Sequence, residues 1–202
     1  MKKEKSIYRE YIEALVTALV LALIIRTFVV QAFKIPSGSM IPTLQIGDHI
    51  LVNKFIYGVQ IPFTDKKIFV FNHPQRGDIV VFKFPQDPSR DFIKRVIAKG
   101  GDTVEIVNRE VYVNKKKLDE PYIQHTDSID TKDMLPRDVM SPVTVPINKI
   151  FVMGDNRDHS YDSRFWGFVD LSAVRGEALF VYWSWDKDKT SVRFRRIGRT
   201  IK

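Results

Sequence analysis

Two side chains far apart in this sequence could together attack a carbonyl group. The first is Ser39, in the stretch IPSGSMIPTL at residues 35–44. Pro36 and Pro42 restrict the backbone on either side, and Gly38 allows a close approach that a side chain would block. Such a loop can present the Ser39 hydroxyl to a bound carbonyl, but Ser-Gly-Ser is also common in turns and linkers. A catalytic role for Ser39 therefore requires a general base from another part of the chain.

The second side chain is Lys94, in the stretch DFIKRVI at residues 91–97. In a strand, alternation places Lys94 on the same face as Phe92 and Val96. Burial against apolar neighbours disfavours the charged amine and lowers its pKa, and a neutral lysine can accept the proton of Ser39. The alternative is a structural lysine whose amine reaches solvent or pairs with a carboxylate.

A third polar segment, GDNRDHSYDSRFWG at residues 154–167, follows an apparent strand. Its carboxylates, arginines and hydroxyls could form a hydrogen-bonded network that holds a neighbouring site rigid. A calcium-binding or well-ordered surface loop is the alternative, although the acidic spacing does not match an EF-hand.

Composition limits the possible functions. The chain has 202 residues, 44% of them hydrophobic, which suits one moderate globular domain with an appendage. It has no cysteine, so disulfides, thiolate metal sites and a cysteine nucleophile are excluded. The net charge of +8 favours an anionic partner, either nucleic acid or a phospholipid surface.

The N-terminal region favours the phospholipid surface. Residues 14–25 read ALVTALVLALII without a charge, and TFVV follows Arg26. Twelve helical residues span only about 18 Å, so we expect a transmembrane anchor over residues 11–30, with Glu13 and Arg26 near its ends. Positive charges gather ahead of it, at Lys2, Lys3, Lys5 and Arg9.

The positive-inside rule then predicts the topology. Residues 1–10 would be cytoplasmic, and residues 31–202 would form an extracytoplasmic domain. A cleavable signal peptide ending at residues 30–32 (VQA) is the competing interpretation, but Arg26 interrupts the approach to that cut. A buried core helix fits poorly beside such a basic start.

After the anchor, short alternating apolar runs separated by turn residues predict strands. Because no helical patterns intervene, we expect a mostly β body, barrel-like or a coiled antiparallel sheet. Residues of about 105–148 are more charged and richer in proline, which indicates an inserted subdomain that caps rather than catalyses. The predicted strands cover residues 50–52, 78–82, 92–97, 103–107, 111–113, 150–152 and 178–183.

Taken together and in order, these features resemble the bacterial type I signal peptidases, or leader peptidases. These Ser/Lys serine proteases of family S26 cut signal peptides from exported proteins. The resemblance rests on the N-terminal anchor, PSGSMIPTL at residues 36–44, Lys94-Arg95 before Gly101-Asp102, and GDNRDHSYDSR at residues 154–164. It implies one transmembrane helix followed by a mostly β catalytic domain with an inserted, smaller β-rich subdomain.

The resemblance also implies roles for individual residues. Ser39 would be the nucleophile and Lys94 the general base of an acyl-enzyme mechanism. Ser37 would donate its hydroxyl to the oxyanion together with the Ser39 backbone N–H, and Ser160 would orient the Lys94 amine. Cleavage would follow a small-x-small site, such as Ala-x-Ala.

A supporting network and a substrate pocket are implied as well. Asp162 and Arg164 would form an ion pair, with Asp155 in the same network. Ile35 and Ile93 would line the small pockets for substrate residues −1 and −3.

Two positions depart from the family pattern. Residues 98–100 read AKG where many relatives have Gly-Leu-Pro, which puts the turn after the lysine strand in question. His159 stands where asparagine is common and would permit a Ser-His mechanism, although Lys94 is better placed as the base.

The implied partners are preprotein signal peptides and membrane phospholipid, with no nucleic acid, cofactor or metal; no histidine pair has metal-ligand spacing. The location would be the plasma or inner membrane. Tyr182, Trp183 and Trp185 suit either a membrane interface or the core, and the basic tail at residues 193–202 could contact anionic lipid.

Two other classes stay open. A self-cleaving repressor also uses serine and lysine on a β body, but it would begin with a DNA-binding helix pair. A membrane-tethered binding module would explain the charge and the anchor, yet it leaves three ordered motifs without a role.

Overall fold

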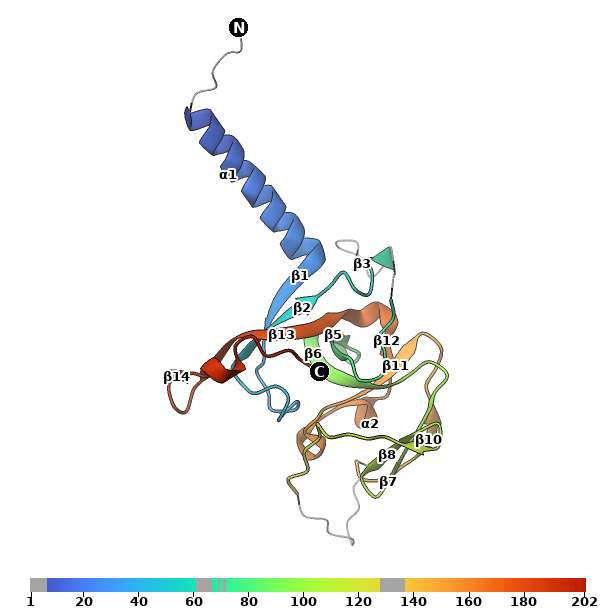
Figure 1. Cartoon of the computed structure of the whole chain (residues 1–202). Helices are drawn as coiled ribbons and strands as arrows, with labels where there is room; N and C mark the ends of the chain where they lie inside the picture. Colours follow the sequence, from blue (N-terminus) through green and yellow to red (C-terminus); the bar gives the residue numbers. More distant parts are fainter. Residues whose placement is uncertain (1–6, 61–66, 69, 71, 128–136) are drawn as a thin grey trace.

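The computed structural model describes residues 7–60, 67–68, 70, 72–127 and 137–202. Lys2, Lys3 and Lys5, on which the predicted cytoplasmic start depends, lie outside the described residues. The described body consists mainly of antiparallel strands with few helices, so the prediction of a mostly β protein is confirmed (Figure 1).

The largest sheet contains eight strands in the order β1-β2-β13-β5-β6-β11-β12, and β14 pairs with β13. Register shifts in β13 against β2, and in β6 against its neighbours, bend these two longest strands and coil the sheet. The strands are β1 (Val30–Lys34), β2 (Asp48–Asn53), β5 (Ile79–Phe84), β6 (Asp87–Lys99), β11 (Lys149–Met153), β12 (Val169–Asp170), β13 (Val174–Asp186) and β14 (Ser191–Val192).

A second sheet lies mostly within the predicted insert, although β7 begins two residues before it, and has the order β10-β7-β8-β9. It projects from the end of the main sheet that carries β11 and β12 (Figure 1). The insert boundaries at about 105–148 stay a prediction. The strands are β7 (Thr103–Val107), β8 (Glu110–Val113), β9 (Lys116–Lys117) and β10 (Met140–Thr144), and a separate two-stranded sheet pairs β3 (Val59–Gln60) with β4 (Lys67–Ile68).

The N-terminal helix α1 (Ile7–Ile24) projects away from the β body (Figure 1). A π-helical turn, η1 (Ile25–Val29), leads directly into β1. The predicted span over residues 11–30 therefore differs from the observed helix at both ends. The helix already includes Ile7, and Val30 belongs to the sheet, where it pairs with Asn53. Among the residues that the structure describes, we find no helix that is both long and apolar enough to cross a membrane, so the predicted span is not confirmed.

The short helical segments lie in the C-terminal half of the chain, beside the main sheet. They are η2 (Arg157–His159), α2 (Ser163–Trp166), η3 (Leu171–Ala173) and η4 (Phe194–Arg196). Asp162 caps α2 by accepting a hydrogen bond from the Arg164 backbone N–H.

The buried apolar residues form three clusters. One combines residues of the Ser39 loop with residues of β2, β5 and β13, and another joins the second sheet to β6 and β11 of the main sheet. A third cluster contains Val80, Phe82 and Val96, with Phe92 and Trp166 packed against it. Lys94 lies between Phe92 and Val96 along β6 and pairs with Val80 of β5, so this third cluster is next to it.

The C-terminal segment is tied to the start of β2 by a buried ion pair. Arg196 donates to both carboxylate oxygens of Asp48, and its guanidinium also donates to the Thr43 carbonyl at 2.9 Å. Ser184 on β13 donates to the same carboxylate at 2.7 Å. These bonds anchor the chain on the C-terminal side of Ser39.

We predict that Phe82→Ala lowers the free energy of unfolding by about 3–5 kcal/mol, because truncating a buried phenylalanine removes apolar burial and leaves a cavity. Phe82 is 0% exposed, between the rings of Phe92 and Trp166. Phe194, which is 76% exposed, provides the matched control, and Phe194→Ala is expected to change stability by less than about 0.5 kcal/mol. Equal losses in urea titrations would contradict this packing.

Candidate active site

The Ser39 loop connects β1 to β2 and is closed at its base by backbone hydrogen bonds. The Ile35 N–H donates to the Asp48 carbonyl at 2.8 Å, and the Gly47 N–H donates back to the Ile35 carbonyl at 3.0 Å. Met40 and Leu44 are both 0% exposed and anchor the loop in the core. Ser39, 9% exposed, is therefore held in place by its immediate neighbours.

Lys94 reaches Ser39 from β6. Its amine nitrogen Nζ donates to Ser39 Oγ at 2.8 Å and to the Ile93 carbonyl at 3.0 Å. The side chain is buried, and Nζ lies 5.4 Å from the centre of the Phe92 ring, as expected for two residues on one strand face. Residues 55 positions apart thus meet in one hydrogen bond.

Burial sets the protonation of this amine. Loss of solvation lowers the pKa of Lys94 from 10.5 to about 8. The carboxylates of Asp162 and Asp155 act in the opposite direction, and the positive charge of Arg164 adds to the lowering. The amine can therefore be neutral at mildly alkaline pH, when the Ser39 hydroxyl can donate its proton across the same contact.

The third polar segment joins the site through Asp155. Arg95 binds this carboxylate with two hydrogen bonds of 2.8 Å, and Thr43 in the Ser39 loop donates to it as well. Arg95 also lies against the ring of Tyr122, 3.7 Å from its centre. The fully buried Asp155 thus links the loop, β6 and the segment at residues 154–167.

Asp162 and Arg164 form the predicted ion pair. The guanidinium contacts both carboxylate oxygens, at 2.8 and 2.9 Å, and both side chains are buried. Asp162 also accepts from the Gly154 N–H at 3.0 Å, while Arg164 donates to the Arg157 carbonyl at 2.7 Å. This pair fixes the two ends of the polar segment against each other.

Gly154 allows this segment to approach Ser39 closely. A Cβ at this position would overlap both the Ser160 hydroxyl and the Ser39 carbonyl oxygen. Ser160 is buried beside the Ser39 loop, but its Oγ has no hydrogen-bond partner among the described residues. The structure thus brings Ser160 near the loop without bonding it to Lys94, and its orienting role stays a prediction.

The other predicted residues take different positions. Ser37 is exposed, so its part in an oxyanion hole stays a prediction. Ile35 is 2% exposed in the main apolar cluster, and Ile93 packs against the same cluster. The two isoleucines thus belong to the same apolar region, and their place in a substrate pocket stays a prediction.

The structure also adds one residue to the site. Asn156 donates from its side chain to the Gly38 carbonyl at 3.0 Å and from its backbone to the Ser39 carbonyl at 3.1 Å. Sequence reasoning missed it, although its place in the polar run beside Asp155 was a signal.

Other side chains of the polar segment contact Thr126 and Asp127. His159 is exposed and lies 3.5 Å from Asp127, and Asp158 accepts from the backbone N–H groups of Thr126 and Asp127. The loop carboxylates are thus engaged by protein donors. Within the described ranges, no three His, Asp or Glu side chains are grouped to hold a metal ion.

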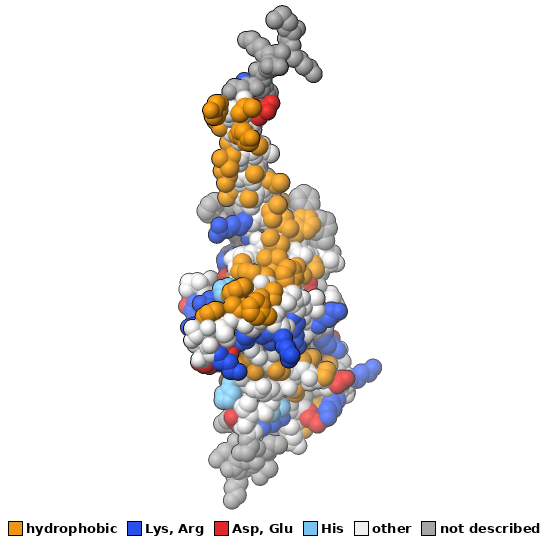
Figure 2. All heavy atoms as spheres, turned by 60° about the vertical axis from the view of Figure 1, so that its left-hand side comes forward, with side chains coloured by type: hydrophobic (Ala, Val, Ile, Leu, Met, Phe, Trp, Pro, Cys, Tyr) orange, Lys and Arg blue, Asp and Glu red, His pale blue; other side chains and the backbone are white. Residues whose placement is uncertain are grey.

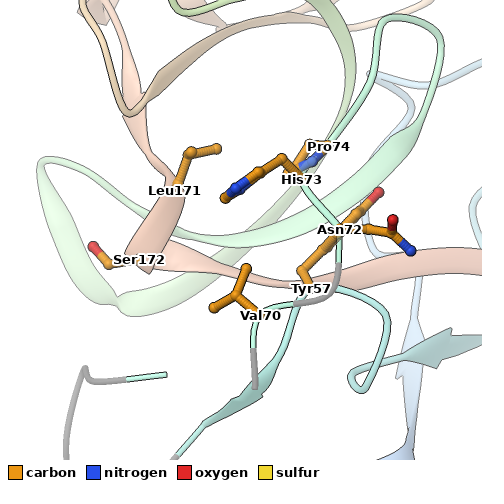
Figure 3. A pocket seen from close by; sticks show the side chains of 7 residues that line it. All are labelled: Tyr57, Val70, Asn72, His73, Pro74, Leu171 and Ser172. Carbon is orange, nitrogen blue, oxygen red and sulfur yellow. The ribbon is translucent and has the colours of Figure 1, made fainter. Parts of the chain in front are cut away.

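A separate cavity of about 180 Å³ opens beside Tyr57, whose hydroxyl donates to Asp78 at 2.7 Å. The side chains of Val70, His73 and Leu171 are among those around it (Figure 3). None of the predicted site residues lines this cavity, so it does not belong to the Ser39 site.

The lowered pKa of Lys94 predicts a pH-dependent stability. Between about pH 8 and 10.5 the unfolded chain binds a proton that the folded chain has lost, so this group makes stability rise with pH. We expect the free energy of unfolding of the wild type, relative to Lys94→Met, to increase across this window in urea titrations. A flat difference, or one that falls with pH, would contradict a buried amine with a lowered pKa.

The sequence of this chain is similar to those of known proteins. Residues 8–183 match the family model described as signal peptidase, peptidase S26. A signal peptidase I of Pseudomonas aeruginosa is 37% identical, over 94% of this chain and 78% of the relative. A probable signal peptidase I-2 of Synechocystis is 39% identical, over 90% of this chain and 78% of the relative.

A crystal structure of a signal peptidase I from Enterococcus faecalis is 35% identical, covers 52% of this chain and 97% of its own, and aligns with a TM-score of 0.43. The match of the family model over most of the chain, together with the two sequence relatives, is decisive: this chain belongs to the signal peptidase family, peptidase S26.

Proposed function

We propose that this chain is a signal peptidase I, a serine endopeptidase that removes N-terminal signal peptides from exported preproteins with a Ser39/Lys94 dyad. The observation that carries the proposal is the 2.8 Å contact between Lys94 Nζ and Ser39 Oγ, made by a buried amine with a lowered pKa. Membership of the peptidase S26 family and the names of the relatives support the substrate class.

The chemistry is acyl transfer in two steps. Neutral Lys94 takes the Ser39 proton while Oγ bonds to the scissile carbonyl carbon. The tetrahedral intermediate then collapses, and the Lys94 ammonium protonates the leaving amine of the mature protein. Lys94 next deprotonates a water molecule, which attacks the ester and releases the signal peptide as a carboxylic acid, restoring Ser39.

Several neighbours have proposed roles in this reaction. The Ser39 backbone N–H and the Ser37 hydroxyl stabilise the oxyanion, and each such donor can contribute about 3 kcal/mol. Ser160 orients the Lys94 amine. Ile35 and Ile93 line shallow apolar pockets that accept the small residues of a small-x-small site.

The proposed reaction is tested by incubating the purified protein with a preprotein and reading the product N-terminus by mass spectrometry. We expect wild type to cut after a small-x-small site and Ser39→Ala and Lys94→Met to lose at least about 10³-fold in rate, since each removes a reacting group. The matched controls are the exposed residues Ser141→Ala and Lys116→Met, which should cut normally.

Either of two results would overturn the dyad: normal cutting by a Ser39 or Lys94 variant, or loss of cutting by both control variants. Binding of preprotein without cutting by folded wild type would instead favour the membrane-tethered binding module.

We further propose that the protein is held at the plasma or inner membrane by α1, with its N-terminus cytoplasmic and residues 31–202 extracytoplasmic. After Glu13, the helix has no charged residue as far as Ile24, and its large apolar side chains are exposed, for example Leu15 at 62% and Leu23 at 61%. Such a surface is stable when lipid covers it.

The β body carries a second surface suited to lipid. Tyr182 and Trp183 are each 40% exposed, and Phe194 and Ile197 are exposed near them in the C-terminal segment, whereas Trp185 is only partly buried. Figure 2 shows apolar side chains continuing from α1 onto the body, with lysine and arginine side chains at the border. Interfacial aromatic residues with basic neighbours favour an anionic membrane surface.

This membrane contact is tested with vesicles of phosphatidylcholine, with and without phosphatidylglycerol, and sedimentation of bound protein. We expect the double variant Arg195→Ser/Arg199→Ser to lose about 5- to 30-fold in affinity for anionic vesicles only, because each exposed cation contributes about 1 kcal/mol near such a surface. Lys115→Ser/Lys116→Ser on the second sheet is the charge-matched control. Equal losses in the two double variants would contradict a localised contact.

A further inference from the structure

Asn156 hydrogen-bonds to the backbone carbonyls on both sides of the Ser39 α-carbon. Its side-chain nitrogen Nδ2 donates to the Gly38 carbonyl at 3.0 Å, and its backbone N–H donates to the Ser39 carbonyl at 3.1 Å. Because Gly38 presents an acceptor, the nitrogen rather than the oxygen of the amide must face it. Asn156 is 5% exposed, so these bonds are shielded from water.

The Gly38 carbonyl has a direct geometric link to catalysis. It belongs to the same peptide unit as the Ser39 N–H, and in a trans peptide these two groups point in opposite directions. A donor that holds the Gly38 oxygen therefore fixes the direction of the Ser39 N–H. The Ile41 N–H contacts the same oxygen at a longer 3.2 Å. Polarisation of the peptide by both donors also strengthens the Ser39 N–H as a donor.

Asn156 is itself rigidly supported. Its neighbour Asp155 is held by the two bonds from Arg95. The backbone of Gln124 runs alongside, donating to the Asp155 carbonyl at 2.9 Å and accepting from the Arg157 N–H at 3.0 Å. The amide of Asn156 therefore has little freedom to follow a displaced loop. The polar segment can impose an orientation on the peptide between Gly38 and Ser39.

We propose that Asn156 is a positioning residue that aims the Ser39 N–H at the developing oxyanion. This inference rests on the proposed function, in which that N–H is an oxyanion donor. Asn156 does not touch substrate. It acts by fixing one peptide plane, so its removal lowers stabilisation of the tetrahedral state more than it weakens binding of the intact substrate.

The test compares Asn156→Ala with Asn156→Asp, which keeps the shape of the side chain but cannot donate to Gly38. Losing an oxyanion donor outright costs about 10²–10³-fold in kcat, and Ile41 still holds the peptide in part, so we expect a 10- to 100-fold loss in kcat for each variant. KM should stay within about twofold of wild type. Asn72→Ala, an exposed asparagine beside the cavity in Figure 3, is the control and should behave as wild type.

A second measurement separates positioning from general loosening of the site. A peptide aldehyde ending in Ala-x-Ala forms a hemiacetal when Ser39 Oγ bonds to its carbonyl carbon and the serine proton passes to the former carbonyl oxygen. The corresponding peptide alcohol binds without forming that bond. We expect both Asn156 variants to weaken binding of the aldehyde by about 10- to 100-fold and binding of the alcohol by less than about twofold, by analogy with loss of oxyanion stabilisation.

Each outcome decides the inference. Normal kcat in either folded variant overturns it, as does equal weakening of aldehyde and alcohol. If the alanine variant fails to fold, the isosteric aspartate variant carries the test. Cutting or adduct formation by Ser39→Ala would overturn the proposed function, and the inference would fall with it. If the wild type cuts by means of Ser39 and the Asn156 variants are unimpaired, only the inference is overturned and the proposed function stands.

Discussion

Burial of the Lys94 amine is the constraint on which the rest of the site depends. A charged amine in this position would lose its hydration, and the protein relieves that cost by lowering the pKa to about 8. The apolar cluster around Val80, Phe82 and Val96 supplies the dry environment. Without that packing the amine would be a solvated cation, and Lys94 could not act as the base that the proposed dyad needs at its 2.8 Å contact with Ser39.

Charge in the surrounding network has to be balanced for the same reason. Asp155 and Asp162 attract a proton to Lys94 and so oppose the effect of burial. Each carboxylate is bound by its own arginine through two hydrogen bonds, Arg95 and Arg164 respectively. The carboxylates can therefore organise the backbone around Ser39 while much of their negative charge is offset locally.

Sequence patterns predicted the strands that alternate in burial, such as β2 and β7, because a period of two can be seen in the sequence of each strand. β1 was missed because the predicted anchor included Val30, and Gln31 and Lys34 leave the rest of this stretch without a clear alternating pattern. β10, with its exposed Ser141 and Pro142, carries little apolar signal. The family motifs nominated Ser39 and Lys94 as partners. Asn156 escaped notice because its contacts are to main-chain carbonyls, whose positions no spacing rule encodes.

Because the path from α1 to Ser39 is short, the N-terminal part of the molecule sets the distance between Ser39 and any surface that α1 contacts. One π-helical turn joins the helix to β1, and the Ile35 N–H is bonded to β2 only one residue after β1 ends, so no flexible linker intervenes. Any surface that holds α1 would hold Ser39, the proposed nucleophile, at one fixed height above it. The distance of a peptide bond from that surface would then limit which bonds Ser39 can contact, before any recognition of the neighbouring side chains. Bonds presented at other heights would not meet Ser39.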